Sequence, residues 1–371
     1  KLKKPNVAFK TKRRKIKEKL SIMKPLSLGI LMIVIITKQG TAGFVCLNEG
    51  DFTLRFGEGA FKEVSQEPDK ESELADDSYF RYVKLVNFAE AKDGKAVVKM
   101  ADHKFGEGDT TKAAFEAELL TVLKNVEATP VLYGCLNHDN KIFLVMEKLC
   151  KGIYTKEMVK KFHDLSAYKK IFKFLQIATA IQALHEKGFT HQKISTLSIL
   201  SSDSEMSDLR LSDLSSAKRV GEESSTLDPS SYDTMDKHRP TFKAELYHDI
   251  HAFALTTLGM ENPDFAYFEG VDRKCFSVEY YDNFREEYNK NCIGEYKRRI
   301  NELSQKSQLS EYFSFLESEL YNEANRLTMS KIIKKLVEVY AKLANEEMKS
   351  LQSSMGKVKE IESRFTNQVL L

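Results

Sequence analysis

The residues best suited to chemistry lie in one stretch, LHEKGFTHQKISTLSIL, which runs from Leu184 to Leu200. It has the frame of a loop for phosphoryl transfer, in which a carboxylate accepts the proton of the attacking hydroxyl. Lys193 occupies the place of that carboxylate, and an ammonium group at neutral pH accepts no proton. The stretch therefore indicates either an enzyme that has lost its base or a segment that only resembles such a loop in sequence.

The elements that must position this loop fall into two halves. Between residues 51 and 146, β-branched and aromatic runs predict the strands DFTLRFGEGAFKEV, YFRYVKLVNFAEA, GKAVVKM, VLYGCLN and KIFLVMEKL. One segment among them, TKAAFEAELLTVLKNV, has apolar residues at helical spacing. From residue 151 on the chain is predicted to be mostly helical. A strand-rich lobe with one helix, followed by a helical lobe, predicts a two-lobed α+β fold.

A short apolar run, PLSLGILMIVIIT at residues 25–37, follows a basic segment. It is too short to span a bilayer comfortably as a helix, and the small residues at 40–43 suit a signal-peptidase site. We expect residues 1–43 to be a basic lead and a cleaved signal peptide, which would send the protein into the secretory pathway as a secreted or luminal protein. A signal anchor through residues 25–37, which would be the protein's one link to a membrane, and a buried core segment are the alternatives.

The composition excludes some classes of partner and site. The net charge of +3 and the scattered lysines give no footprint for nucleic acid. The five cysteines show no metal-type pairing, so a zinc site is not expected. In an oxidising compartment Cys275 and Cys292 could close a loop, although their spacing alone does not establish a disulfide.

Two segments have a simple structural interpretation. The acidic stretch SQEPDKESELADDS, residues 65–78, is expected to be an exposed insertion. Residues 343–371 form a predicted amphipathic helix with apolar residues close to three-four spacing, namely Leu343, Met348, Leu351, Met355, Val358, Ile361 and Phe365. We expect this helix to pack back onto its own domain, with a surface for a partner as the alternative.

The order of landmarks between about residues 51 and 343 resembles the eukaryotic protein kinase family. The resemblance implies a kinase-like domain at residues 44–342, with an N-lobe at about 50–149 and a C-lobe at about 150–342. FGEGAFKEV resembles the family's glycine-rich loop, in which Gly57 and Gly59 would let backbone amides approach phosphates, with Lys62 at the third glycine position. AVVKM resembles the strand whose lysine, here Lys99, contacts the phosphates of ATP, and Glu118 would hold that ammonium in place.

The hinge and the metal motif have counterparts as well. KIFLVMEKL resembles the strand and hinge between the lobes, with Met146 behind the adenine pocket and the backbone of Glu147 to Leu149 facing a purine. LRLSDLSSAKRV resembles the family's metal motif, so Asp213 would hold magnesium against ATP.

Four positions of the catalytic loop depart from the family pattern. The motif H-R-D-x-K-x-x-N reads here as His191, Gln192, Lys193, Ile194, Ser195, Thr196, Leu197 and Ser198. Lys193 replaces the base, Gln192 the arginine, Ser195 the phosphate-contacting lysine and Ser198 the second metal ligand. Only His191, structural in the family, is retained.

Two further residues of the C-lobe match positions of the family. Asp249 is expected to tie down the loop backbone, and Arg326 occupies the position of a structural arginine whose usual glutamate partner is not recognisable.

These observations leave three functions open. The first is a pseudokinase that works by binding protein partners, with or without ATP and magnesium. The second is an active, divergent ATP-dependent protein kinase that uses another carboxylate, such as Asp203 or Asp208. The third is a small-molecule phosphotransferase of kinase-like fold, which would also need the missing Asp. The sequence favours the first and leaves the oligomeric state open.

Overall fold

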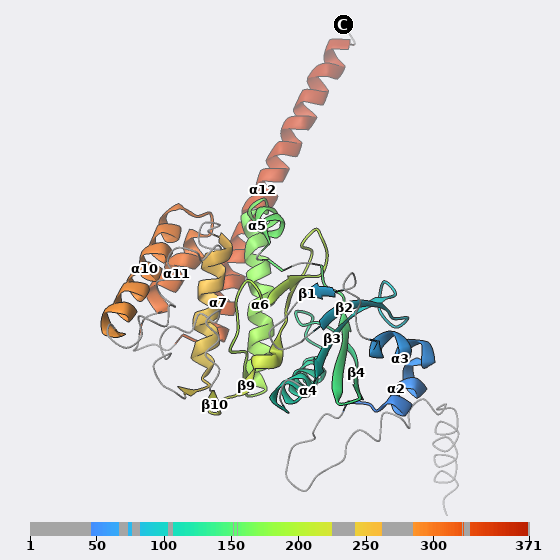
Figure 1. Cartoon of the computed structure of the whole chain (residues 1–371). Coiled ribbons are helices and arrows are strands. Elements are labelled where there is room, and N and C mark those ends of the chain that lie inside the picture. The colour runs from blue at the N-terminus through green and yellow to red at the C-terminus, as the bar shows by residue number, and fades with distance from the viewer. Residues whose placement is uncertain are drawn as a thin grey trace, which may run out of the picture.

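The computed structural model describes residues 46–66, 73–75, 82–102, 107–150, 152–153, 155–224, 242–261, 285–320, 322 and 327–369. These residues form a strand-rich N-terminal lobe and a helical C-terminal lobe that lie side by side (Figure 1). The two-lobed α+β fold predicted from the sequence is confirmed.

The N-terminal lobe is built on one antiparallel sheet with the order β1-β2-β3-β5-β4. Its strands are β1 (Glu73–Ala75), β2 (Tyr82–Asn87), β3 (Lys95–Asp102), β4 (Leu132–His138) and β5 (Lys141–Glu147). Asp139 and Asn140 join β4 to β5 with φ of 50° and 59°, the left-handed conformation that a tight hairpin turn requires. Four of the five predicted strands are confirmed, and β1 lies inside the acidic stretch expected to be an insertion.

Helix α4 (Glu107–Val122) covers one face of this sheet. Its buried residues Ala113, Ala117 and Leu120 pack against strand residues that include Cys135 and Leu144. Because alanine has the smallest apolar side chain, the helix can lie close to the strands. The helix predicted for this segment is confirmed.

The predicted strand at DFTLRFGEGAFKEV is wrong, because this segment forms helices α2 (Glu49–Phe56) and α3 (Glu58–Ser65). Asn48 caps α2 by accepting a hydrogen bond from the Asp51 amide, and Gly57, with φ of 91°, turns the chain between the helices. Phe52 and Val64 are buried in the cluster that covers the second face of the sheet. The apolar residues of this segment recur every three to four positions, which is a helical spacing, and the sheet face provides the surface that buries them.

The C-terminal lobe consists mainly of helices. They are α5 (Lys156–His163), α6 (Ala167–Glu186), α7 (Leu246–Glu261), α10 (Arg285–Lys306), α11 (Ser310–Glu319) and α12 (Met329–Val369). Every residue of α7 from His248 to Met260 is buried, so this helix forms the centre of the lobe. The prediction of a mostly helical second half is confirmed, and α6 buries an apolar face that includes Ile171, Ile181 and Leu184.

Short strands and one turn of 3₁₀ helix complete the region between the lobes. They are β6 (Phe189–Thr190), β7 (Ile199–Ser201), β8 (Leu209–Leu211), η3 (Leu214–Ser216), β9 (Lys218–Arg219), β10 (Glu223–Ser224) and β11 (Phe242–Lys243). β6 pairs with β9, β7 with β8 and β10 with β11. These pairings fix the loop at residues 191–198 and the segment around Asp213 between the lobes.

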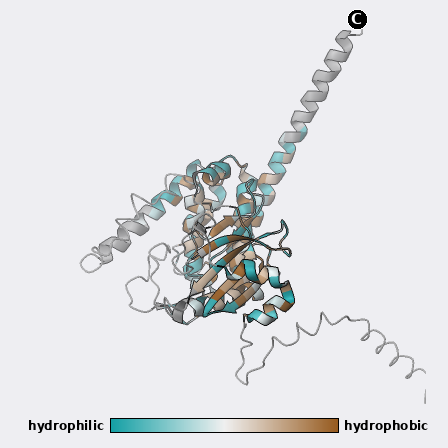
Figure 2. Cartoon of the chain, turned by 45° about the vertical axis from the view of Figure 1, so that its right-hand side comes forward, coloured by the Kyte–Doolittle hydropathy of each residue, from teal (hydrophilic) through white to brown (hydrophobic). Residues whose placement is uncertain are grey.

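Helix α12 begins at Met329, fourteen positions before the predicted start at residue 343. Its first turns pack in the C-terminal core, where Ile332, Leu336 and Val339 are buried. Beyond about Leu343 the helix projects away from both lobes (Figures 1 and 2). This differs from the expectation that the C-terminal helix packs back onto its own domain along its length.

Several predicted features lie outside the described residues: the apolar run at residues 25–37, most of the acidic stretch, Cys275, Cys292 and Arg326. Among the helices that the structure does describe, none is long and apolar enough to cross a membrane.

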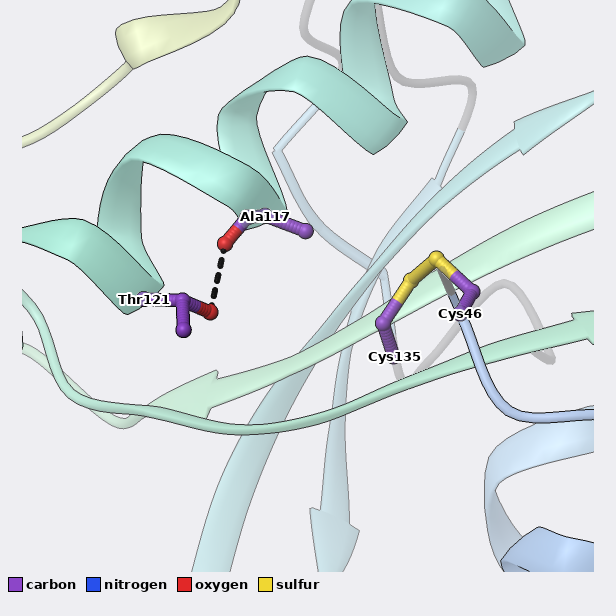
Figure 3. Close-up of a disulfide and its surroundings, with 4 residues drawn as sticks. All are labelled: Cys46, Ala117, Thr121 and Cys135. Atoms are coloured by element: carbon purple, nitrogen blue, oxygen red, sulfur yellow. Dashed lines mark hydrogen bonds between the residues drawn. A yellow bond between two sulfur atoms is a disulfide. The ribbon is translucent and has the colours of Figure 1, made fainter. Parts of the chain in front are cut away.

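A disulfide joins Cys46 to Cys135 at the edge of the sheet, beside the helix that carries Ala117 and Thr121 (Figure 3). Next to it the Leu47 amide donates to the Cys135 carbonyl at 2.8 Å, and the Asn137 amide donates to the Leu47 carbonyl at 2.8 Å. The segment before α2 therefore lies alongside β4 and is fixed there by a covalent bond. The sequence analysis did not anticipate this disulfide.

Replacing both cysteines by serine should lower the free energy of unfolding by about 2–4 kcal/mol, because the bond closes a long loop and restricts the unfolded chain. The two residues are 89 positions apart. Denaturant unfolding of the oxidised protein and the C46S/C135S variant measures the difference. Cys150→Ser is the control, since Cys150 is exposed and free. Equal stabilities of the double variant and the wild type would contradict this role.

Candidate interlobe site

Lys99 lies on β3 and pairs with Glu116 on α4, with 3.3 Å between its Nζ and Oε1 of the carboxylate. Glu116 is fully buried, and its Oε1 also accepts a hydrogen bond from the Leu214 amide at 3.3 Å. One carboxylate thus joins the sheet, helix α4 and the segment that follows Asp213.

The prediction that Glu118 holds Lys99 is wrong, because Glu116 makes that ion pair. The face of α4 toward the sheet contains alanines as well as buried leucines. Glu116 lies between Ala113 and Ala117 on this face, whereas Glu118 is half-buried.

The buried carboxylate of Asp249 on α7 holds the backbone of the loop at residues 191–198. Asp249 accepts hydrogen bonds from the backbone amides of His191 at 2.7 Å and Gln192 at 3.0 Å, and its Oδ2 lies 2.9 Å from His185 Nε2. Burial by itself raises the pKa of Asp249, but the His185 contact and the amides outweigh it and hold the pKa below its usual value. The expected role of Asp249 is confirmed, and His185 is a partner that the sequence analysis missed.

His191 is buried and connects the loop to the segment before Asp213. Its Nδ1 accepts from the Lys193 amide at 3.2 Å, and its Nε2 lies 2.9 Å from the Ser212 carbonyl oxygen. Burial lowers the pKa of His191. A neutral ring with the proton on Nε2 satisfies both contacts, which agrees with a structural role.

Lys193 forms an ion pair with Asp213, the central interaction of the site. Its Nζ lies 2.8 Å from Oδ2 of Asp213, and both side chains are largely buried. The other carboxylate oxygen, Oδ1, accepts a hydrogen bond from the Ser215 hydroxyl at 2.9 Å. Burial raises the pKa of Asp213, but Lys99 and Lys193 together outweigh it and lower the pKa to about 2. Asp213 is therefore a carboxylate whose counter-charge comes from the protein.

Ser195 and Ser198 form a closed turn. The Ser198 hydroxyl accepts from the Ser195 amide at 3.0 Å and donates to the Ser195 carbonyl at 3.0 Å. The Ser195 hydroxyl accepts from the Leu197 amide at 3.2 Å. Gln192, in the left-handed region with φ of 65°, donates through Nε2 to the Thr190 hydroxyl at 2.9 Å. Three of the four side chains that depart from the family pattern, Gln192, Ser195 and Ser198, therefore serve the local structure of the loop.

The interpretation of Gly57 and Gly59 as a phosphate cradle is wrong. Gly57 separates α2 from α3 and Gly59 lies in α3, on the face of the sheet opposite α4. The hairpin beside the strand of Lys99 is β1–β2, and its connection, residues 76–81, reads DDSYFR. That connection contains no glycine, although close approach of the backbone to phosphates depends on glycine.

The hinge residues lie at the end of β5. Met146 is buried with Leu214 in the cluster beneath α4. The Glu147 amide donates to the Val131 carbonyl at 2.8 Å, and its carboxylate Oε2 accepts from the Val131 amide at 3.2 Å. Leu149 is half-buried. The backbone amide of Glu147 is thus used in a hydrogen bond to Val131. Met146 acts as a core residue.

The residues present do not fit a magnesium ion. Both oxygens of Asp213 already have partners, Lys193 and Ser215. The Ser198 hydroxyl, at the position of the second ligand, is used within its own turn. A divalent cation would have to displace a buried ammonium from Asp213 and would then meet Lys99 and Lys193 at close range, which like charges oppose.

The two carboxylates considered as substitute bases lie elsewhere. Asp203 and Asp208 are in the connection between β7 and β8, at the end of this hairpin away from Ser198 and Ser212. Asp208 accepts from Gln176 on α6 at 2.6 Å, and Asp203 accepts from the Ser207 amide at 2.9 Å. Their positions explain them as turn residues and do not bring them to the site.

The fold and this site define a protein of the kinase class with an altered centre. In a comparison with protein-family models, residues 54–245 match the family described as protein tyrosine and serine/threonine kinase. The match covers more than half of the chain, and the chain therefore belongs to this family. No curated protein matches the sequence significantly.

Lys193→Met should destabilise the protein at neutral pH by about 3 kcal/mol, because it leaves Asp213 buried and ionised with less compensation. The wild-type pKa of about 2 lies below the ordinary value of 3.8, so the stability from this carboxylate is present above about pH 4 and lost as the pH falls toward about 2. The variant raises this pKa, which makes the loss of stability between about pH 4 and pH 2 smaller than in the wild type. Denaturant unfolding between pH 7 and pH 2.5 measures both effects.

The double variant K193M/D213N is the control, since it removes both charges and should recover most of the stability at pH 7. It should also show the smallest change in stability below about pH 4. A K193M protein as stable as the wild type at pH 7 would contradict the ion pair.

Proposed function

We propose that this member of the protein kinase family is a pseudokinase, a kinase fold that acts by binding protein partners without transferring phosphate. The observation that carries the proposal is the ion pair between Lys193 and Asp213, 2.8 Å long and largely buried. In this one contact, the residue at the position of the base, Lys193, pairs with the residue at the position of the metal ligand, Asp213.

The magnitudes favour this function over an impaired enzyme. Loss of a general base alone costs about 10²–10⁴ in rate, and positioned charge supplies much of the rest in phosphoryl transfer. Here the ammonium removes the base and also neutralises the carboxylate that should hold the metal. The β1–β2 connection also has no glycine to let the backbone approach phosphates. Three contributions to phosphoryl transfer are therefore weakened together: the base, the metal ligand and the glycine-rich loop.

The two enzyme alternatives have less support. A divergent kinase or a small-molecule phosphotransferase needs an ionised carboxylate beside the acceptor hydroxyl. Of the buried carboxylates that the described residues bring to this site, Glu116 is held by Lys99, Asp213 by Lys193, and Asp249 by the loop backbone with His185.

The proposed location is the secretory pathway, with the protein secreted or luminal. Two features support it: the apolar run at residues 25–37 followed by small residues, and the disulfide between Cys46 and Cys135. Structural disulfides form in oxidising compartments and are rare in the cytosol.

Purified wild-type protein should transfer no phosphate from labelled ATP to itself or to generic protein substrates, with magnesium or manganese. Lys193→Asp should not restore an efficient enzyme, because Gln192, Ser195 and Ser198 leave the other contacts missing. The matched control is Asp213→Asn in the wild-type background, which should leave the signal at background. Stoichiometric phosphorylation by the wild type that D213N abolishes would overturn the proposal.

Lys193→Ala should create a metal-responsive site by freeing one oxygen of Asp213. The wild type should show no rise in melting temperature with millimolar Mg²⁺ or Mn²⁺, whereas the variant should gain about 1.4 kcal/mol of stability at ten times the dissociation constant. Thermal unfolding with and without the ion measures it.

Lys170→Ala is the matched control for this experiment. Lys170 forms a buried pair with Glu261 at 3.2 Å in the C-terminal lobe, so its loss exposes a carboxylate away from the site. A metal response in the wild type, or none in K193A, would contradict the view that Lys193 replaces the metal.

A further inference from the structure

Helix α12 carries two apolar stripes, of which the fold uses one. The first stripe includes Met329, Ile332, Leu336 and Val339, all buried in the C-terminal core. The second stripe begins at Val337 and shares no residue with the first.

The second stripe repeats with a strict alternation of four and three residues. Its members are Val337, Ala341, Ala344, Met348, Leu351, Met355, Val358, Glu362, Phe365 and Val369. Nine of these ten are apolar, over about 48 Å of helix at 1.5 Å per residue. A seven-residue repeat held this long is typical of a helix that winds around another helix.

This stripe lies on a face of α12 that is distinct from the face toward the core. Val337 is 47 % exposed and Met348 is 58 % exposed, Ala341 is exposed, and Ala344 is half-buried. At 3.6 residues per turn, the second stripe is rotated around the helix by roughly 110° from the core-facing residues. The repeat therefore starts in the turns of α12 that pack on the body of the protein and continues in the sequence of the part of the helix that projects from it (Figure 1).

A projecting helix needs a packing partner, since most helical stability in proteins comes from tertiary contacts. The sequence adds a reason, because Gly356 and several serines lie within the projecting part and weaken its intrinsic helix propensity. A second helix with the same repeat would cover the stripe along its whole length.

We propose that the partner is a second copy of this chain, and that two α12 helices form an antiparallel coiled coil through the second stripe. In a parallel pair, each Glu362 would face its own copy and the alanines would face alanines. Like charges would then meet in the seam, and the alanine end would be underpacked.

The antiparallel arrangement matches the stripe residue by residue. With the centre of the pair near residue 353, Phe365 lies opposite Ala341 of the second copy, and Glu362 lies opposite Ala344 of the second copy. Met355 then meets Leu351, and Met348 meets Val358. Large residues thus face small ones, and the flanking positions bring no like charges together, with Glu347 against Ile361 and Asn345 against Lys359.

This arrangement goes beyond the proposed function and does not depend on it. It sets the two kinase-like bodies at opposite ends of one rod. Each body would present its interlobe region separately, so the pair would be a bivalent scaffold.

Light scattering after size exclusion, with the full chain at tens of micromolar, tests the assembly. The wild type should have the mass of a dimer. Met348→Glu with Met355→Glu should raise the dissociation constant by about a hundredfold or more, because both charges enter the apolar seam. The matched control is S350E/S353E, which adds the same charge to the same segment outside the stripe and should remain dimeric.

The orientation has its own test, Ala344→Lys. In the antiparallel pair the new ammonium faces Glu362 of the second copy and should lower the dissociation constant, whereas in a parallel pair it would face a like charge and raise it. A monomeric wild type, or a dimer that M348E/M355E leaves intact, overturns the proposal. A dimer that A344K weakens overturns the antiparallel arrangement.

Discussion

Buried carboxylates between the two lobes must each find a positive or hydrogen-bonding partner, and this constraint organises the centre of the molecule. Glu116, Asp213 and Asp249 all lie in surroundings that penalise an isolated charge. Glu116 takes Lys99 and the Leu214 amide, Asp213 takes Lys193 and Ser215, and Asp249 takes two loop amides with His185. Removing any one of these partners leaves a buried charge, which is costly.

The same constraint explains the surroundings of the metal motif in this member of the kinase family. A divalent ion normally neutralises that motif in the family, and in this structure Lys193 places a positive charge beside the corresponding Asp213. The surrounding loop has adapted to local structure, since Ser195 and Ser198 bond to each other and Gln192 bonds to Thr190. The region between the lobes is therefore stabilised by an internal network of ion pairs and hydrogen bonds.

The periphery shows a second adaptation. The helices α2 and α3 cover the face of the sheet that α4 leaves open, and the disulfide fixes the segment before them to β4. Helices α2 and α3 and helix α12 lie at the periphery of the two lobes (Figure 1). The first two add apolar burial beside a covalent link, and α12 extends away from the body.

The sequence by itself determined the two lobes, four strands of the sheet, helix α4, the mostly helical C-terminal lobe and the role of Asp249. These features follow from local patterns in the sequence. The periodicity of apolar residues predicts the strands and helices, and the order of the motifs along the chain identifies individual residues within them. Tertiary structure alone decided that Glu116 and not Glu118 meets Lys99, because the face of α4 toward the sheet depends on how closely alanines let it pack. It also decided that the segment with Gly57 and Gly59 forms helices, since that depends on a sheet face lying free to bury Phe52 and Val64. The disulfide between Cys46 and Cys135 was likewise beyond the sequence, because it joins residues far apart in the chain whose proximity arises only when the sheet has formed.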